Sequence, residues 1–395
     1  MLAVPCHKPL HNLRLPLEEN IKNDYKEHRI IVFQRYQKMD SWLILTLGTI
    51  IISFLASFSG FLIYLKKPLP EQYSFLEKNL AFAPFYLICA FLFCLIYLLV
   101  PTENDFINNI SFAAVIIPMI LAGIVYGFSL FQKTAKFTSL ALLAAVAVST
   151  FLLPEEFLLF KGNLPFWLDR LAIIAVWFIF SNFFYILNGI DGFLGSAAIC
   201  ISGAFIILGL LDAMPFFFTL TALCLTTVTA AFLIFNWFPS RLSFTTGSCR
   251  VLGFILGWLL TFTGSEGLAP CNLILITVFV LELLQAAFKK ISLRDRYNSL
   301  TVNTTYYQAN ISGLSPSQVC IFLFKLQTIF IILACFQLYM PNAYSLPALS
   351  LILGAWFLTK LKNWQTPDRS LSELNKDIIE DLRRNIDDIK KLGKD

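Results

Sequence analysis

The sequence predicts an all-α, polytopic membrane protein with about eleven transmembrane helices. Of its 395 residues, 57% are hydrophobic and only 14% are charged, whereas a soluble chain has about 45–50% apolar and about 25% charged residues. The mean hydropathy is +0.71. The apolar stretches are long enough to span a bilayer, at roughly 17–25 residues each. Together these observations exclude a soluble globular protein, because so few polar side chains could not cover a core of this size.

The candidate spans are separated by short segments that contain proline, glycine or charged residues, which are typical of turns and membrane interfaces. They begin near Trp42, Ala81, Ile110, Thr138, Asp169, Phe193, Phe216, Val251, Asn272, Ser317 and Ala343. We therefore divide the chain into a hydrophilic N-terminal tail (1–41), a multispan domain (42–361) and a hydrophilic C-terminal tail (362–395).

The basic residues of the short loops indicate the orientation, because such residues favour the cytoplasm. They follow the first, third, seventh (Arg241 and Arg250) and ninth spans, and the opposite loops contain only Lys161 and Arg170. This pattern predicts a cytoplasmic C-terminus and an external start of the first span. The tail 1–41 conflicts with it, because this segment holds seven basic residues and would have to cross the membrane. Either translation begins at Met39, or the tail is cytosolic and the span count is off by one.

Apolar residues recur every three or four positions in the C-terminal tail, which predicts an amphipathic helix over 371–392. The opposite face mixes acidic and basic residues. This mixture favours self-association or a partner helix over binding to anionic lipid, and a solvated tail is the remaining alternative. The nine cysteines form no C-x-x-C pair, so neither a disulfide framework nor a zinc site is expected. No basic and aromatic pattern indicates nucleic-acid binding.

Ionisable residues within apolar spans are candidates for function, because burying them in a membrane is costly. Four acids qualify, but Asp169 and Asp212 lie at span ends and are interpreted as interfacial markers. Glu282 lies within the ninth span. Asp191 lies where Gly189 and Gly192 interrupt an apolar run. Asn188 and Asp191 would share a face if this turn were helical; the alternative is an ordinary turn between two spans.

Three segments, in the same order, resemble motifs of the polyprenyl-phosphate sugar-1-phosphate transferases. Residues 182–192 resemble the family's N-A-x-N-x-x-D-G-x-D-G-L segment. Residues 235–241, followed by Gly247 and Ser248, resemble its F-N-x-P-P-A-[KR]-x-F-x-G-D-x-G-S loop. Residues 313–318 read G-L-S-P-S-Q and resemble the sequence after its histidine motif.

The resemblance implies an activity of the bacterial inner membrane. In this family a polyprenyl phosphate attacks the β-phosphate of a UDP-amino sugar, releases UMP and leaves a lipid diphosphate sugar for cell-envelope synthesis, with Mg²⁺ as cofactor. It implies a catalytic role for Asp191, while the metal ligands stay unassigned. The implied substrate-binding residues are Asn182, Asn188, Asn236, Arg241, Gly247 and Ser248.

Basic residues after the ninth span add candidates for binding phosphate through charge-assisted hydrogen bonds. They are Lys289, Lys290, Arg294 and Arg296. The nearby Tyr297, Tyr306 and Tyr307 could stack on a nucleotide base. The alternative is that these charges only follow the positive-inside rule.

The chain departs from the family at the residues that bind the cation or move protons. The early Asp-Asp pair is replaced by neutral residues within 123–127, and the Gly-Asp site by residues 244–246. Asn188 replaces the first aspartate of the D-G-x-D-G segment. Thr301 replaces the later aspartate, and residues 304–307 (Thr-Thr-Tyr-Tyr) replace the H-x-H-H motif.

Three hypotheses follow from these replacements. The chain is a transferase whose chemistry has moved onto Asp191 and Glu282, or a catalytically silent relative that binds lipid phosphate or nucleotide sugar as a scaffold or regulator. A third, weaker hypothesis is a transporter or flippase component, although the spans contain few paired charges for an ion relay.

Overall fold

The computed structural model describes residues 46–59, 62, 112–131, 135–155, 157–160, 164–292, 300–340 and 344–364. The chain divides into two units, Met1–Ile52 and Ser53–Asp395. In the first unit, residues 46–52 are helical, and in the second unit the description begins with helical residues 53–59. The rest of the fold described below belongs to the second unit.

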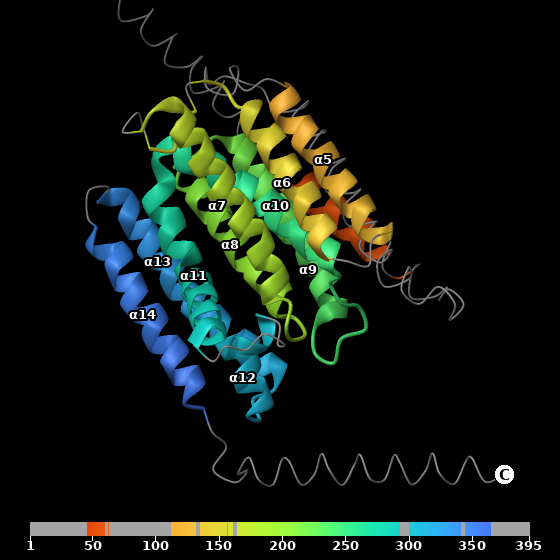
Figure 1. Ribbon diagram of the computed structural model, residues 1–395, viewed down its shortest axis with the longest axis vertical. Helices are drawn as coiled ribbons and strands as arrows, with labels where there is room; N and C mark the ends of the chain where they lie inside the picture. The colour runs from red at the N-terminus through yellow and green to blue at the C-terminus, as the bar shows by residue number, and fades with distance from the viewer. Residues whose placement is uncertain are drawn as a thin grey trace, which may run out of the picture. The chain divides into compact units, whose positions relative to one another are not determined.

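Every regular element in the described part of the second unit is a helix (Figure 1). The longer ones are α5 (Phe112–Phe131), α6 (Ala135–Phe151), α7 (Phe166–Leu187), α8 (Phe193–Leu210), α9 (Phe216–Asn236), α10 (Thr246–Thr263), α11 (Ala269–Ser292), α13 (Pro316–Tyr339) and α14 (Ser345–Lys362). Three short elements join them: the π-helix η3 (Gly264–Leu268), the 3-10 helix η4 (Thr301–Asn303) and α12 (Thr305–Ile311). The all-α prediction is confirmed.

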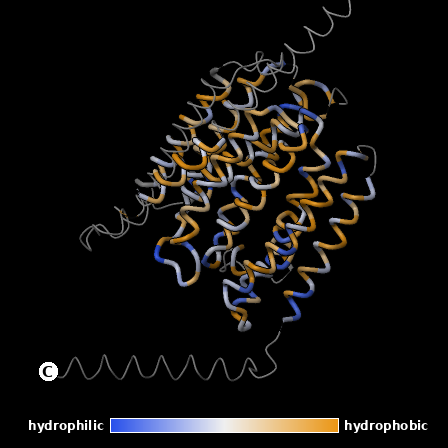
Figure 2. The backbone as a smooth tube through the Cα atoms, turned by 180° about the vertical axis from the view of Figure 1, so that it is seen from behind, coloured by the Kyte–Doolittle hydropathy of each residue, from blue (hydrophilic) through white to orange (hydrophobic). Residues whose placement is uncertain are grey.

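Each of these nine longer helices begins within about five residues of a span start that the sequence predicts. Among the described residues, five helical stretches are long and apolar enough to cross a membrane: 166–187, 193–210, 216–236, 246–291 and 316–339. Figure 2 shows the hydrophobic colour along the helices and the hydrophilic colour mainly in the connections. The span near Ala81, the N-terminal tail and residues 365–395 of the C-terminal tail lie outside the described residues, so the count of eleven stays a prediction.

Sequence signals account for several helix starts. Pro165 and Pro215 stand at the N-caps of α7 and α9, and Pro316 is the first residue of α13, where the missing N–H of proline costs no helical hydrogen bond. Reciprocal capping boxes start α10, between Thr245 and Ser248, and α13, between Ser315 and Gln318. Each box satisfies two backbone groups that would otherwise lack a helical partner.

Small residues let neighbouring helices approach closely, as is usual in membrane proteins. Helix α7 packs on α10, α8 on α9, α5 on α6 and α10, and α11 on both α13 and α14. At the α7–α10 contact, the indole Nε1 of Trp177 donates to the carbonyl of Phe254 at 2.9 Å. A Cβ added to Gly257 would lie 2.5 Å from Cδ1 of Trp177, so only glycine fits beside this indole.

Asp169 and Arg170 fold the α6–α7 connection onto the start of α7. The Asp169 carboxylate accepts the backbone N–H groups of Leu159 (3.1 Å) and Phe160 (2.9 Å). The Arg170 guanidinium donates to the carbonyl of Thr150 (3.2 Å) and to carbonyls of the following turn. Both side chains are buried. The pair therefore satisfies backbone groups at this end of the bundle, which is a more specific role than that of an interfacial marker.

Candidate functional site

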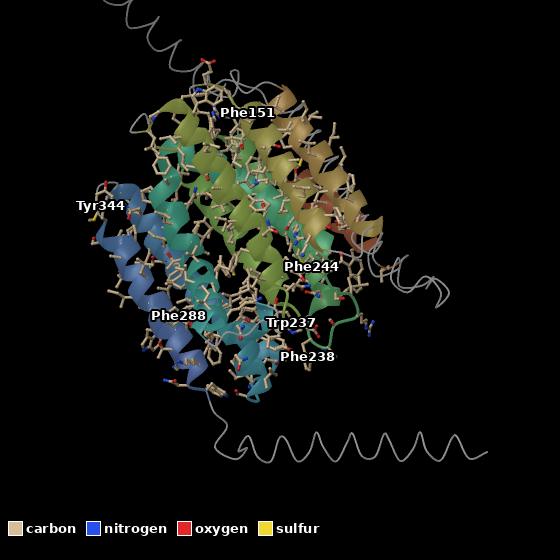
Figure 3. All side chains as sticks on the ribbon, viewed as in Figure 1. Phe151, Trp237, Phe238, Phe244, Phe288 and Tyr344 are labelled. Atoms are coloured by element: carbon tan, nitrogen blue, oxygen red, sulfur yellow. The ribbon has the colours of Figure 1, made fainter. Side chains whose placement is uncertain are left out.

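The segments that resemble the transferase motifs meet at one end of the helix bundle (Figure 1). They are the turn 188–192, the loop 237–245, the start of α10, the segment from η4 to α12 and the start of α13. Figure 3 shows Trp237, Phe238 and Phe244 at this end, while Phe151 lies at the opposite end. We refer to this region as the motif end.

The turn 188–192 holds the loop 237–245 in place. Helix α7 ends at Leu187 and Gly192 has a φ of 77°, so the turn is not helical and the condition for Asn188 and Asp191 to share a helical face is not met. Asn188 Nδ2 donates to the carbonyl of Phe244 at 2.9 Å, and Asp191 Oδ2 accepts the backbone N–H of Ser240 at 3.1 Å. Both side chains thus bind the same loop at two points.

Asn236 joins the same two segments from the end of α9. Its Oδ1 accepts the backbone N–H of Gly192 at 3.2 Å, and its Nδ2 donates to the carbonyl of Leu242 at 2.7 Å. Its side chain is 3% exposed. Both polar atoms of Asn236 are therefore used inside the protein. Arg241, in contrast, is exposed on the loop.

Asn182 lies at a partly buried junction of three helices. Its Oδ1 accepts hydrogen bonds from Ser139 Oγ on α6 (2.8 Å) and from Arg250 Nε on α10 (3.1 Å). The Arg250 guanidinium also lies 5.0 Å from the ring centroid of Tyr185, a cation–π distance. Because Arg250 is 3% exposed, it is not one of the charges that face the cytoplasm, which corrects the interpretation made from loop charges.

Gly247 and Ser248 shape the start of α10. A Cβ added to Gly247 would overlap the side chain of Ser129 on α5, so glycine permits the close contact between these helices. Ser248 Oγ accepts the backbone N–H of Thr245 at 2.6 Å as part of the capping box. Both residues are buried, and their roles in substrate binding stay predictions.

A stacked aromatic pair fills the space between the turn 188–192 and α12. Tyr306 stacks on Phe193 with ring centroids 4.1 Å apart, and its hydroxyl donates to the carbonyl of Ile186 at 2.8 Å. Tyr306 is 1% exposed, and burial raises the pKa of its phenol well above its ordinary value. It has no free face for a nucleotide base, which corrects the expectation for this residue. Tyr307 is half-buried.

Glu282 caps α12 from the neighbouring helix α11. Its Oε1 accepts the backbone N–H groups of Thr305 and Tyr306, the latter at 3.2 Å. One and two turns further along α11, Gln285 Oε1 accepts from Thr305 Oγ1 at 3.0 Å, and Lys289 Nζ donates to the carbonyl of Asn303 at 3.2 Å. One face of α11 therefore holds the whole η4–α12 segment.

The structure describes only some of the remaining basic candidates. Lys290 is half-buried at the end of α11. Arg294, Arg296 and Tyr297 lie outside the described residues. Of the basic candidates described at the motif end, Arg241 is exposed, whereas Lys289 and Lys290 are each half-buried.

The residues present do not fit the Mg²⁺ site that the resemblance implies. A magnesium site in this kind of enzyme uses one or two carboxylates together with substrate phosphates. Here the Glu282 carboxylate binds the α12 backbone and Asp191 binds Ser240. Within the described part of the chain, no three His, Cys, Asp or Glu side chains gather closely enough to hold a metal ion. The metal ligands therefore stay unassigned.

Sequence reasoning missed several residues that build this region. Gln285 follows Glu282 by three positions, so helical spacing places it on the same face and could have identified it. Lys289, seven positions after Glu282, is predicted from the sequence only as a phosphate-binding residue. Phe193 and Ser139 carry no such signal, because their partners Tyr306 and Asn182 are 113 and 43 residues away along the chain.

One comparison with known proteins agrees with this arrangement. The family model for glycosyl transferase family 4 matches residues 109–264, which extend from α5 to the first residue of η3. The first two resembling segments lie inside this match, and residues 313–318 lie beyond it. No curated protein matches the chain. With its apolar helices, the chain is a multi-pass membrane protein. Across residues 109–264, the chain is therefore similar to glycosyl transferase family 4, as its first two motif segments lead us to expect.

Proposed function

We propose that this protein is a catalytically silent member of its family, which binds a polyprenyl phosphate or a UDP-sugar and serves as a scaffold or regulator of cell-envelope glycosyl transfer. The observation that carries the proposal is the position of Tyr306, which replaces a histidine of the family motif. It is buried against Phe193 and bonded to the Ile186 carbonyl. A side chain held in this way contacts protein on all sides and supports packing rather than proton transfer.

The two acids at the motif end support the same conclusion. Glu282 caps α12, and Asp191 holds Ser240, so both stabilise the backbone of this region. Phosphoryl transfer depends on charge stabilisation by a cation and its carboxylate ligands. Each 1.36 kcal/mol of lost transition-state stabilisation costs a factor of about ten in rate. Replacing four or five such groups by neutral residues is therefore expected to abolish the family reaction.

Side-chain hydrogen bonds fix the backbone around these residues, which favours a retained binding function. Asn188, Asp191 and Asn236 fasten the turn 188–192 to the loop 237–245. The exposed Arg241 lies on that loop, and Lys290 lies at the end of α11. A guanidinium and an ammonium at this end suit a phosphate or diphosphate group.

We place the protein in the bacterial inner membrane with its C-terminus in the cytoplasm. This proposal rests on the loop charges and on the family. The amphipathic helix expected over 371–392 lies outside the described residues, and we propose that it mediates self-association or binds a partner protein, through which a scaffold would act.

Binding without a metal ion is the first test. Purified full-length protein in detergent would be titrated with UDP-N-acetylglucosamine and, separately, with undecaprenyl phosphate, in EDTA. Binding of either ligand supports the proposal, and Arg241→Gln or Lys290→Gln should weaken that binding. Lys136→Gln is the matched control, because Lys136 is also exposed at this end. Absence of binding for both ligands, or equal losses in the control, would contradict the proposed binding role.

A rebuilt transferase is the second candidate, and Asp191 favours it. This residue occupies the position of the family's second aspartate in the D-G-x-D-G segment and is half-buried rather than fully buried. Only its Oδ2 accepts the Ser240 N–H. Transfer of sugar phosphate that disappears in Asp191→Asn would support this candidate over the silent one.

A further inference from the structure

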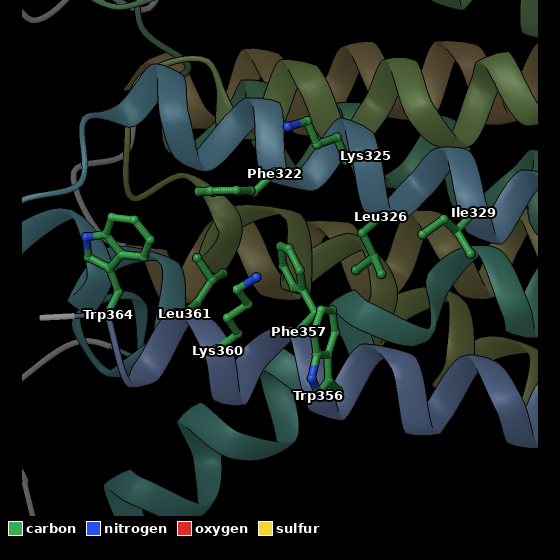
Figure 4. A pocket seen from close by; sticks show the side chains of 9 residues that line it. All are labelled: Phe322, Lys325, Leu326, Ile329, Trp356, Phe357, Lys360, Leu361 and Trp364. Carbon is green, nitrogen blue, oxygen red and sulfur yellow. The ribbon is translucent and has the colours of Figure 1, made fainter.

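A groove between α13 and α14 carries two lysines and lies apart from the motif segments. Its volume is about 280 Å³. Figure 4 shows Lys325 on one helix and Lys360 on the other, with Lys360 pointing into the groove. The two helices run in opposite directions, so residues near the start of α13 face residues near the end of α14.

The position of the groove along the bundle follows from its neighbours. Cys320, two residues before Phe322 of the groove, lies with its Sγ 3.7 Å from the carbonyl oxygen of Asp191. Lys360 is two residues before the end of α14. The groove therefore opens at the same membrane face as the motif end, within about two to three helical turns of the helix ends.

The charge of the groove is entirely positive. None of its lining residues is acidic, and neither Lys325 nor Lys360 forms an ion pair within the described part of the chain. Lys325 Nζ lies 5.7 Å from the ring centroid of Phe322, and Lys360 Nζ lies 5.2 Å from that of Trp356. Aromatic faces thus hold both ammonium groups beside the groove and leave them available to an anion.

The remaining walls suit a lipid rather than a soluble anion. Leu326 and Phe357 form the buried floor, while Ile329 and Trp356 are 45% and 59% exposed on the outside of the protein. Trp364 closes the end of the groove near its contact with Phe322, at 6.2 Å between ring centroids. Tryptophan and lysine together are typical of the interface between headgroups and hydrocarbon.

We propose that the α13–α14 groove binds an anionic glycerophospholipid of the surrounding leaflet, with its phosphate between Lys325 and Lys360 and its upper acyl chain along Leu326 and Ile329. The two cations match the single negative charge and the multiple acceptor oxygens of such a headgroup. The site is separate from the proposed binding of polyprenyl phosphate or UDP-sugar at the motif end, so either proposal can fail without the other.

The test uses full-length protein in dodecyl maltoside and phosphatidylglycerol with brominated acyl chains, which quench the fluorescence of tryptophans within contact distance. We expect the quenching to saturate, to be much weaker with brominated phosphatidylcholine and to decrease in 0.5 M salt. A Trp356→Phe/Trp364→Phe variant should lose most of this quenching. Equal quenching by both lipids would overturn the proposal, and this comparison needs no lysine variant.

The lysines are tested by the double variant Lys325→Gln/Lys360→Gln, which should weaken phosphatidylglycerol binding about tenfold. The double arginine variant should retain the affinity, and Lys136→Gln should leave it unchanged. Unchanged affinity in the glutamine variant would overturn the assignment. The assignment would also be overturned if the groove bound undecaprenyl phosphate through these lysines but did not bind phosphatidylglycerol. Cross-linking of two copies of the protein through residues of this groove would overturn it as well.

Discussion

Glu282 and Tyr306 are joined by a hydrogen bond that links two helices. The Glu282 carboxylate on α11 accepts the backbone N–H of Tyr306 at 3.2 Å and also that of Thr305. These N–H groups lie in the first turn of α12, where no helical acceptor exists and where the helix dipole favours a negative charge. An acid that the sequence presents as a catalytic candidate therefore caps a short helix.

This role predicts how Glu282 variants behave. Glu282→Ala should lower the free energy of unfolding by about 1–3 kcal/mol, because two buried N–H groups lose their acceptor. Glu282→Gln keeps an acceptor oxygen and should lose less. Thermal unfolding in detergent, with hydrogen exchange of residues 300–312, would measure both. An alanine variant as stable and as protected as the wild type would contradict the capping role.

Asp191 is predicted to hold the loop 237–245 through its bond to Ser240. Asp191→Ala should increase hydrogen exchange at the Ser240 amide, while Asp191→Asn, which retains a side-chain oxygen, should show a smaller increase. Asn188→Ala should loosen the same loop at Phe244, because it removes the donor to that carbonyl. Unchanged exchange in both alanine variants would show that these contacts do not hold the loop.

Gly247 is predicted to be necessary for the contact of α10 with α5. Gly247→Ala should destabilise the protein by about 1–3 kcal/mol, because the added methyl overlaps Ser129. Adding Ser129→Gly should recover part of this loss. Gly203→Ala is the matched control, because nothing lies within 4 Å of its added Cβ, and it should be neutral or stabilising. Equal unfolding temperatures for Gly247→Ala and Gly203→Ala would contradict the prediction.

Tyr306→Phe should destabilise the protein by about 1 kcal/mol, because the Ile186 carbonyl loses its donor. The burial of Tyr306 also predicts a pH effect, since its pKa is raised in the folded state. Its contribution to stability is complete below the unfolded pKa of about 10 and decreases as pH rises above that value.

Between about pH 9 and pH 11, the free energy of unfolding of Tyr306→Phe should therefore decrease less than that of the wild type. Unfolding temperatures across that range would measure the difference, and Tyr307→Phe, at a half-buried position, is the matched control. Identical pH profiles for the wild type and Tyr306→Phe would contradict the effect of burial.

The sequence predicts the helices well because the length of an apolar stretch is a local property. Phe193 and Phe216, for example, are the first residues of α8 and α9, as the pattern predicts. The sequence also identifies the turn around Asp191, because Gly189 and Gly192 interrupt the apolar run there. The partners of the polar side chains could not be predicted, because Asn182 meets Arg250 and Glu282 meets Thr305 only after the helices have packed.

The region from η4 to α12 shows the same limit. The sequence predicts that Tyr306 replaces a family histidine, but not that it stacks on Phe193. Exposure depends on neighbouring helices, so a tyrosine that could bind a base and a tyrosine that fills a core look alike in the sequence. The buried Arg250 was misinterpreted for the same reason.

The most direct measurement is transfer of radiolabelled sugar phosphate from UDP-amino sugars to undecaprenyl phosphate by the purified protein, with Mg²⁺ or Mn²⁺, beside an active family enzyme. The proposal of a catalytically silent protein predicts that this protein transfers no label into the lipid phase, while the family enzyme does. Metal-dependent transfer that is abolished by Asp191→Asn would contradict it and show that the reaction centre has been rebuilt around Asp191.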